Sequence, residues 1–377
     1  MEEKTAENSF PLKVPNQLRR FCVFCGQAPA SKTREHIIPQ WLIRLTGNEK
    51  RKICVGINKA NGERIIHSAL SNVFPACNEC NNKYSELERS AQNTVTSLLD
   101  CKGISEAEFS SLLDWFDKIR VGLWLGDMQR NPSHTFIKRK FHITQRIGNA
   151  DRCLLIGRSN ATTKRLRFIG TNQPLFHFMP SCFGVVINGF YFINMSLGLW
   201  FGHRLGLPTL VDRWEDETSG YIHGELIRGK KKIQLPLVKT HLPEAFVAYF
   251  QPCFENMLFD DSEFRDMVSD TWSKGAFLRS TTKGKIFSIV GEHVFQSNEK
   301  SIVVGDIPAT PDNYISYLTI KNILKMQIEL MKHIPAHSHW KIERRREVDA
   351  IFKGALSVNR RALQLFEQQT RSREPSV

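Results

Sequence analysis

The chain has 377 residues, of which 41% are hydrophobic, and a formal net charge of +14 at pH 7. This length allows two or three domains, and the apolar content excludes an intrinsically disordered protein. The excess of Lys and Arg favours a polyanionic partner, with nucleic acid first and an anionic membrane surface second; a soluble basic protein without such a partner stays open.

The first segment, residues 1–20, is polar and has no apolar stretch of the kind found in secretory signal peptides. We therefore interpret it as a flexible N-terminal arm. The nine cysteines are an odd number. Together these features predict a reducing, cytoplasmic location, where paired cysteines indicate a metal site more often than a disulfide.

Residues 21–98 contain two Cys-x-x-Cys pairs, Cys22–Cys25 and Cys77–Cys80. Structural zinc is bound by four thiolates in a tetrahedron, and two such pairs can supply them. The sequence therefore predicts a four-cysteine zinc site, with two unrelated pairs of buried cysteines as the alternative. The other five cysteines stand singly in apolar runs and are predicted core residues: Cys54, Cys101, Cys153, Cys182 and Cys253.

Between the two pairs lies the run Glu35-His36-Ile-Ile-Pro, and Asn81 directly follows the last cysteine. A neutral imidazole can accept a proton from water near pH 7, and a carboxylate is a hard oxygen ligand for Mg²⁺ or Mn²⁺. Neighbours in an extended segment point to opposite sides, so one can face the water and the other the metal. The amide oxygen of Asn81 can complete the metal shell, and Asn72 can brace the loop that holds His36.

Each of these residues also has a plainer interpretation. A Glu-His pair is commonly a solvated surface feature. Asn81 can simply cap a helix, and Asn72 can simply form a turn. These alternatives stay open for each residue taken alone.

Beyond the cysteines, helical periodicity predicts a helix from Tyr84 onward and a second helix over residues 106–128. Strands are then predicted over residues 135–144, 153–158, 164–169, 221–228 and 232–238, and on both sides of Lys283-Gly284. Residues 182–201 are almost uncharged, but Asn188-Gly189 stands between two β-rich runs. This pattern favours a buried hairpin over a membrane span.

Short helices are predicted over residues 243–250 and 261–272, and longer ones from Asp312 to about Pro335 and over residues 340–368. Residues 371–377 are predicted to be a disordered tail. The predicted fold class is therefore α+β, with a small N-terminal lobe over residues 21–98 and a larger mixed α+β domain over residues 99–370 that ends in helices.

Residues 22–88 resemble the zinc-containing branch of the HNH endonuclease family, which has a ββα-metal fold. The resemblance rests on the order Cys-x-x-Cys, Glu-His-x-x-Pro, and Asn-x(4)-Cys-x-x-Cys-Asn. It implies His36 as the general base, Glu35 and Asn81 as ligands of Mg²⁺ or Mn²⁺, and Asn72 as the loop brace. It also implies nucleic-acid contacts from Arg34 and Lys83, and the four cysteines as ligands of structural zinc.

The chain departs from the family pattern in two ways. Glu35 stands where the family has Asp, which lengthens the ligand arm. The segment between His36 and Asn72 is long and is predicted to contain an inserted hairpin around Ala60-Asn61-Gly62. Glu88, seven residues after Asn81, is either a further ligand or a charge on the helix surface.

The resemblance implies hydrolysis of DNA phosphodiester bonds by a one-metal mechanism, with nicking as the default outcome and RNA not excluded. By analogy it suggests restriction-like or anti-phage defence, with a second copy of the chain or a partner protein of a defence system. It implies no membrane partner. Residues 99–370 resemble no family and are predicted to bind nucleic acid or a partner. The alternative is a non-catalytic, zinc-stabilised protein that binds nucleic acid or interacts with a partner.

Overall fold

The computed structural model describes residues 21–28, 31, 33–47, 49–57, 64–71, 73–130, 143–148, 150–197, 209–215, 222–227, 246–251, 284–290, 293–297, 299–306, 312–331 and 342–370. Several predictions fall outside these residues: the arm over residues 1–20, the tail over residues 371–377, most of the strand over residues 135–144, the strand over residues 232–238, the helix over residues 261–272, and Asn72.

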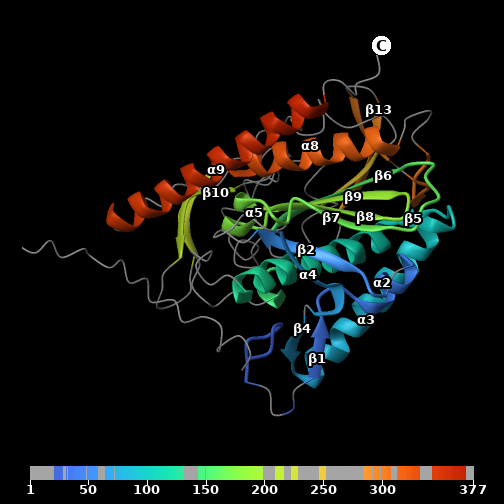
Figure 1. The fold of residues 1–377 in the computed structure, drawn as a ribbon, viewed down its shortest axis with the longest axis horizontal. Helices are drawn as coiled ribbons and strands as arrows, with labels where there is room; N and C mark the ends of the chain where they lie inside the picture. The colour runs from blue at the N-terminus through green and yellow to red at the C-terminus, as the bar shows by residue number, and fades with distance from the viewer. Residues whose placement is uncertain are drawn as a thin grey trace, which may run out of the picture.

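The centre of the molecule is an antiparallel sheet of seven strands in the order β14-β13-β12-β6-β9-β8-β7. Its strands are β6 (Asp151–Arg158), β7 (Leu166–Ile169), β8 (Cys182–Ile187), β9 (Phe190–Leu197), β12 (Val247–Gln251), β13 (Lys285–Val290) and β14 (His293–Gln296). The long helix α4 (Glu106–Arg130) crosses one face of this sheet, and α8 (Asp312–Met331) lies on the other (Figure 1).

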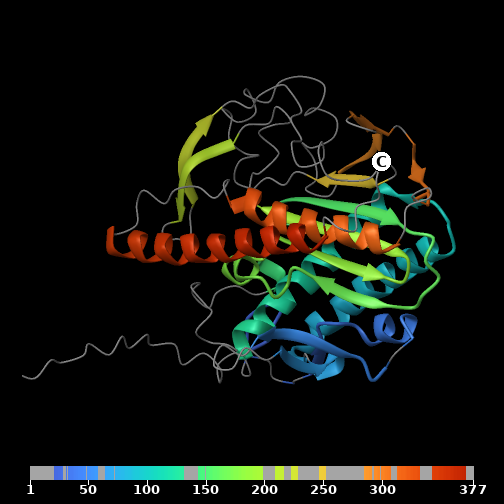
Figure 2. The same ribbon diagram turned by 45° about the horizontal axis from the view of Figure 1, so that its top comes forward.

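Further elements surround the sheet. The helices α5 (Pro174–Phe178) and α9 (Ile342–Thr370) pack against each other and against α8, as the turned view in Figure 2 also shows for α8 and α9. Besides the two strand pairs within residues 33–76, two short pairs lie outside the main sheet in the described residues: β5 (Ile104–Ser105) with β15 (Ser301–Ile302), and β10 (Thr209–Glu215) with β11 (Ile222–Ile227). A 3-10 turn, η3 (Ile143–Gln145), precedes β6.

The central strands β12, β6, β9 and β8 are buried on both faces, and their residues alternate between two apolar cores. In β6, Leu154 and Ile156 belong to the core on the α4 side, whereas Cys153 and Leu155 belong to the core under α8. Because successive side chains of a strand point to opposite faces, this alternation follows directly from the strand geometry. A strand buried on both faces needs an almost uninterrupted apolar sequence, which is what residues 153–156 supply.

The helix α4 is apolar around most of its circumference because it is covered on both sides. The N-terminal unit, which we define as residues 21–99, packs on one side, and the sheet packs on the other. Gly122 marks the close contact with the N-terminal unit: a Cβ atom there would lie 2.6 Å from Cδ1 of Ile37. One continuous core thus runs from the N-terminal unit through α4 to the sheet. The predicted domain boundary at residues 98–99 stays a prediction.

Several sequence predictions are confirmed. The fold is a mixed α+β fold that ends in helices. The second helix spans Glu106–Arg130, and the Asn188-Gly189 hairpin joins β8 to β9 with Ile187 opposite Phe190. All residues of these two strands are buried. No helix in the described ranges is long and apolar enough to cross a membrane.

Other predictions are wrong. Residues 247–250 form a strand rather than a helix: β12 lies between β13 and β6 and is buried throughout. A short apolar run fits a central strand as well as a helix, so periodicity alone could not decide. Cys101 is exposed rather than in the core, whereas Cys153 and Cys182 are buried as predicted. The side chains of Cys54 and Cys253 lie outside the description.

Candidate functional site

The N-terminal unit is built from two antiparallel strands followed by a helix. Strand β1 (Thr33–His36) pairs with β4 (Val73–Ala76), with His36 opposite Val73. The helix α3 (Asn78–Leu99) begins directly after Cys77, which occupies the N-cap position. The connection between the strands holds α2 (Gln40–Leu45), the 3-10 turn η1 (Ala69–Ser71) and the predicted inserted hairpin, formed by β2 (Lys52–Ile57) and β3 (Arg64–Ser68).

The four predicted cysteine ligands come together at the start of α3. All four Sγ atoms lie within 4.8 Å of one another, and those of Cys25 and Cys77 are 4.0 Å apart. Four thiolates at ~2.3 Å from one zinc ion have sulfur–sulfur distances of about 3.8 Å, so the donor set and its spacing fit a tetrahedral ion. This cluster could therefore bind a metal such as zinc.

The local backbone explains why the two pairs meet. The N–H of Cys22 donates to the carbonyl of Gln27 at 2.8 Å, and Gly26 turns the chain with φ 75°, a value that glycine tolerates without strain. The N–H of Val23 then donates to the carbonyl of Pro75 at 2.9 Å. This bond ties the first cysteine pair to β4, the strand that leads into the second pair.

Without a metal ion, ionisation of two of the four thiols is disfavoured. Burial raises the pKa of Cys25 and of Cys80, and the neighbouring sulfurs add to the shift at Cys80. At Cys22 burial also acts to raise the pKa, but backbone N–H groups that donate to its sulfur outweigh burial and lower it. A bound cation would favour all four thiolates together.

A second group of charged side chains lies against β1. Glu35 points inward, and its Oε1 is 2.5 Å from Nζ of Lys118 on α4. Glu88, on α3, contacts the same ammonium group through its own Oε1. Lys118 is fully buried, and Glu35 is almost so. Burial raises the pKa of Glu88; Lys118 opposes this shift, and the charge of Glu35 reinforces it.

Lys118 is held from two directions. Its Nζ lies 6.0 Å from the ring centroid of Phe24, which stacks on Tyr84 at 3.9 Å. Its neighbour on α4, Asp117, accepts hydrogen bonds from Arg120 at 2.6 Å and Arg152 at 3.0 Å. Because Arg152 lies on the central strand β6, this network fixes α4, and with it Lys118, relative to the sheet.

The other predicted site residues are placed as follows. His36 is half-buried next to Glu35, and no polar partner of its imidazole is found among the described residues. Asn81 lies in the first turn of α3, where its carbonyl accepts a hydrogen bond from Ser85 at 2.7 Å. Arg34 and Lys83 are exposed. Within the described part of the chain, Glu35 therefore pairs with Lys118, which Glu88 also contacts, and no hydrogen bond joins Glu35 to Asn81.

Sequence reasoning missed Lys118 and left the role of Glu88 open. Lys118 lies on a helix outside the region with recognisable motifs. A signal was present nonetheless, since Asp117, Lys118 and Arg120 interrupt an otherwise apolar stretch of α4. Charged residues on a helix that is apolar around its circumference must be paired when buried. That pattern predicts partners but does not identify them.

No protein-family model matches this chain. No curated protein matches it, and no solved structure matches it either.

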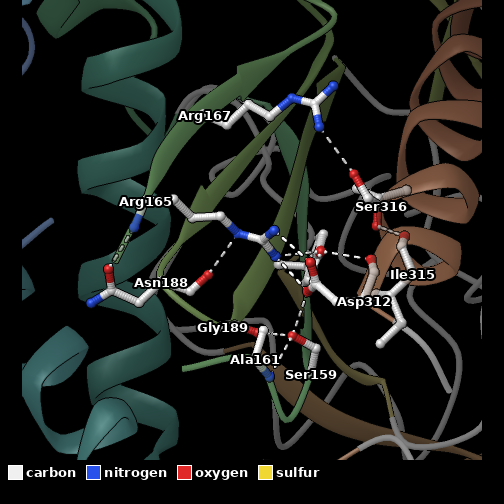
Figure 3. Close-up of polar contacts among 11 residues, drawn as sticks. Ser159, Ala161, Arg165, Arg167, Asn188, Gly189, Asp312, Ile315 and Ser316 are labelled. Atoms are coloured by element: carbon white, nitrogen blue, oxygen red, sulfur yellow. Dashed lines mark hydrogen bonds and ion pairs between the residues drawn. The ribbon is translucent and has the colours of Figure 1, made fainter. Parts of the chain in front are cut away.

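A further polar cluster lies on the opposite side of the sheet, where α8 begins. Arg165 donates to both carboxylate oxygens of Asp312 at 2.5 Å, and Ser159 and Tyr191 donate to the same carboxylate at 2.7 and 2.8 Å. Figure 3 shows Arg165 reaching from the turn at Asn188 to Asp312. Each group here has a partner, and the cluster ties the β8–β9 turn to α8.

Proposed function

We propose that this chain is a metal-dependent endonuclease of the HNH type, which hydrolyses phosphodiester bonds in DNA. One observation carries the proposal: two antiparallel strands and a helix join a four-cysteine cluster to Glu35-His36 at the end of the first strand. This order of elements supports the proposal because it is similar to that expected of a ββα-metal nuclease, in which zinc would hold the scaffold and take no part in the chemistry.

In this mechanism His36 is the general base. Its half-buried imidazole accepts the proton of a water molecule that attacks the scissile phosphorus, a role that histidine often has in catalysis. The exposed side chains of Arg34 and Lys83 are available to contact the DNA phosphates. Asn72 would brace the loop that orients His36.

The carboxylate side of the site fits a hard cation. Two carboxylate oxygens, from Glu35 and Glu88, already gather around one positive charge. Glu35 would hold Mg²⁺ or Mn²⁺, with Asn81 as the second ligand that the motif implies. When bound, this ion would stabilise the negative charge that develops on the phosphate and on the leaving oxygen.

One observation favours the alternative, a non-catalytic zinc protein that binds nucleic acid or a partner. Lys118 neutralises Glu35 without any metal ion, so the pair can be purely structural. The two functions differ in what they predict: the alternative requires binding without metal-dependent cutting.

The test is the nicking of supercoiled plasmid by the zinc-loaded full chain with Mg²⁺ or Mn²⁺. We expect His36→Ala to lose activity by about 100-fold or more, as removal of a general base does. Glu35→Gln should lose activity as well. Glu86→Gln, a change of an exposed carboxylate on α3, is the matched control and should cut like the wild type. If the wild type binds DNA and RNA but cuts neither with either ion, the nuclease proposal fails.

A further inference from the structure

We propose that the ammonium group of Lys118 occupies the position of the catalytic divalent cation while that ion is absent, and leaves it when Mg²⁺ or Mn²⁺ binds. The proposal rests on the proposed nuclease function, because it concerns the ion that Glu35 would hold. It assigns to Lys118 a positioning and regulatory role that no motif in residues 22–88 contains.

The geometry around Lys118 resembles that of a cation site. Oxygens from a strand and from a helix, Oε1 of Glu35 and Oε1 of Glu88, meet at Nζ, and the first of these contacts is 2.5 Å. Mg²⁺ binds carboxylate oxygens at ~2.1 Å, and an ammonium–carboxylate pair is usually ~2.8 Å long. The two side chains would therefore move by less than about 1 Å to exchange an ammonium group for a metal ion.

The charges make the exchange favourable. Two carboxylates face a single ammonium group, so the cluster keeps one uncompensated negative charge when all three groups are ionised. A divalent cation would cancel both carboxylates. It could not share them with Lys118, because an ammonium group a few ångströms from a dication in a buried site is strongly repelled.

A displaced ammonium group has another carboxylate within reach. Asp114 lies four residues before Lys118 on α4, and side chains with this spacing lie on the same face of a helix. The Asp114 side chain is 36% exposed and pairs with Arg152 at 2.5 Å. The side chain of Lys118 can therefore swing toward Asp114 and the solvent without losing a counter-charge.

The location of Lys118 also gives this exchange a consequence for the whole protein. Lys118 belongs to α4, which the Asp117 network joins to β6. The affinity of the site for its ion then depends on how the sheet holds α4. The part of the chain after residue 98 thus sets the ion affinity of the N-terminal unit.

The test measures the Kd for Mn²⁺ of the zinc-loaded full chain without DNA. The electron paramagnetic resonance signal of free Mn²⁺ reports how much of the ion is bound. Lys118→Met removes the competing charge, so we expect the Kd for Mn²⁺ to fall by about tenfold or more. Lys118→Arg keeps the charge and should leave the Kd near the wild-type value. Lys102→Met, at a lysine whose side chain is 67% exposed and pairs with Asp100, should leave it unchanged. An unchanged or higher Kd in a folded, zinc-loaded Lys118→Met overturns the proposal.

Since Lys118→Met leaves two buried carboxylates unpaired, it can fail to fold. The wild type then supplies the second measurement: labelling with an amine-reactive reagent, read peptide by peptide by mass spectrometry. Saturating Mn²⁺ should increase the labelling of Lys118 severalfold and leave Lys102 unchanged. Lys118 that stays protected at saturating Mn²⁺ contradicts the exchange.

These results can be separated from those of the nicking assay. A protein that binds Mn²⁺ with release of Lys118 but cuts no plasmid supports the exchange and removes the nuclease function. A protein that nicks plasmid while Lys118 stays protected supports the nuclease function and contradicts the exchange.

Discussion

The N-terminal unit and the sheet with its covering helices both bury charged side chains, but they compensate the charge differently. In the N-terminal unit, Glu35 and Glu88 share one ammonium group, that of Lys118. At the start of α8, the carboxylate of Asp312 faces one guanidinium group, that of Arg165. When all groups are ionised, the first cluster has one excess negative charge, whereas the second is neutral; burial opposes the ionisation of Glu88 by raising its pKa.

The carboxylate and guanidinium groups that form ion pairs on α4 are equal in number. Asp117 and Asp114 carry two negative charges, and Arg120 and Arg152 carry two positive ones. Buried charges cost free energy unless they are paired, so a complete pairing is what a structural cluster needs. An excess of buried carboxylates is relieved by a proton or by a further cation, and burial does raise the pKa of Glu88. The two regions therefore differ in how their buried carboxylates are compensated, and only the first has an unbalanced set of charged side chains.

The largest expected effect is the loss of the folded N-terminal unit, without a comparable effect on the sheet. Cys77→Ser removes one of the four thiolates and the residue that starts α3. Because a structural zinc site can supply about 10–16 kcal/mol of binding free energy, we expect the variant to lose its zinc and the fold of residues 21–98. Zinc content by atomic absorption and limited proteolysis with peptide mapping measure both effects.

The matched control is Cys101→Ser, at an exposed cysteine outside the cluster. It should keep one zinc ion per chain and the wild-type proteolysis pattern. A Cys77→Ser variant with full zinc content and an intact N-terminal unit would contradict the structural role of the cluster.

The next effect concerns the neutral network on α4. Asp117→Ala leaves the guanidinium groups of Arg120 and Arg152 without a shared carboxylate in a fully buried position. Breaking a buried pair by removing one partner costs about 3–5 kcal/mol, and we expect this loss in the free energy of unfolding. Asp114→Ala should cost about 1 kcal/mol, because Asp114 is partly exposed and Arg152 keeps Asp117. Urea denaturation measures both values; equal costs would show that the network does not depend on burial.

Sequence signals predicted those features that depend on neighbouring residues. The Asn188-Gly189 turn predicted the β8–β9 hairpin, and apolar spacing predicted α4, because both patterns are local. The two Cys-x-x-Cys pairs predicted that the four cysteines lie together, because each pair has the spacing of two ligands of one metal ion. The position of β12 in the middle of the sheet could not be predicted, because a buried strand and a buried helix share the same apolar pattern.

The partners of the candidate site were beyond prediction for a different reason. Glu35, Glu88 and Lys118 lie on three elements, and only the packing of α4 against α3 and β1 brings them together. Motif spacing pointed to Asn81 as the companion of Glu35, whereas the contact seen is with Lys118, which Glu88 also contacts. The roles of His36 and Asn81 stay predictions, and so does that of Asn72, which lies outside the described residues.

The smallest expected effect concerns the cluster around Asp312 and its dependence on pH. Burial acts to raise the pKa of Asp312, but hydrogen bonds from Arg165, Ser159 and Tyr191 outweigh burial and lower it. A carboxyl group with a lowered folded-state pKa stabilises the protein above its unfolded value of ~3.9, and this stability is lost as the pH falls through the folded value. Asp312→Asn should therefore cost about 1 kcal/mol at pH 7, a modest value because the side chain is 27% exposed.

The difference in melting temperature between the wild type and Asp312→Asn tests this prediction. Losses common to both proteins, such as release of zinc in acid, cancel in that difference. It should be constant from pH 7 to about 5 and shrink as the pH falls below about 4. Asp306→Asn is the control, since that pair with Arg158 is half exposed and should give a smaller difference. A difference that persists unchanged at pH 3 would mean that the Asp312 charge contributes nothing. The contrast between a neutral cluster and a charged one would then rest on the N-terminal unit alone.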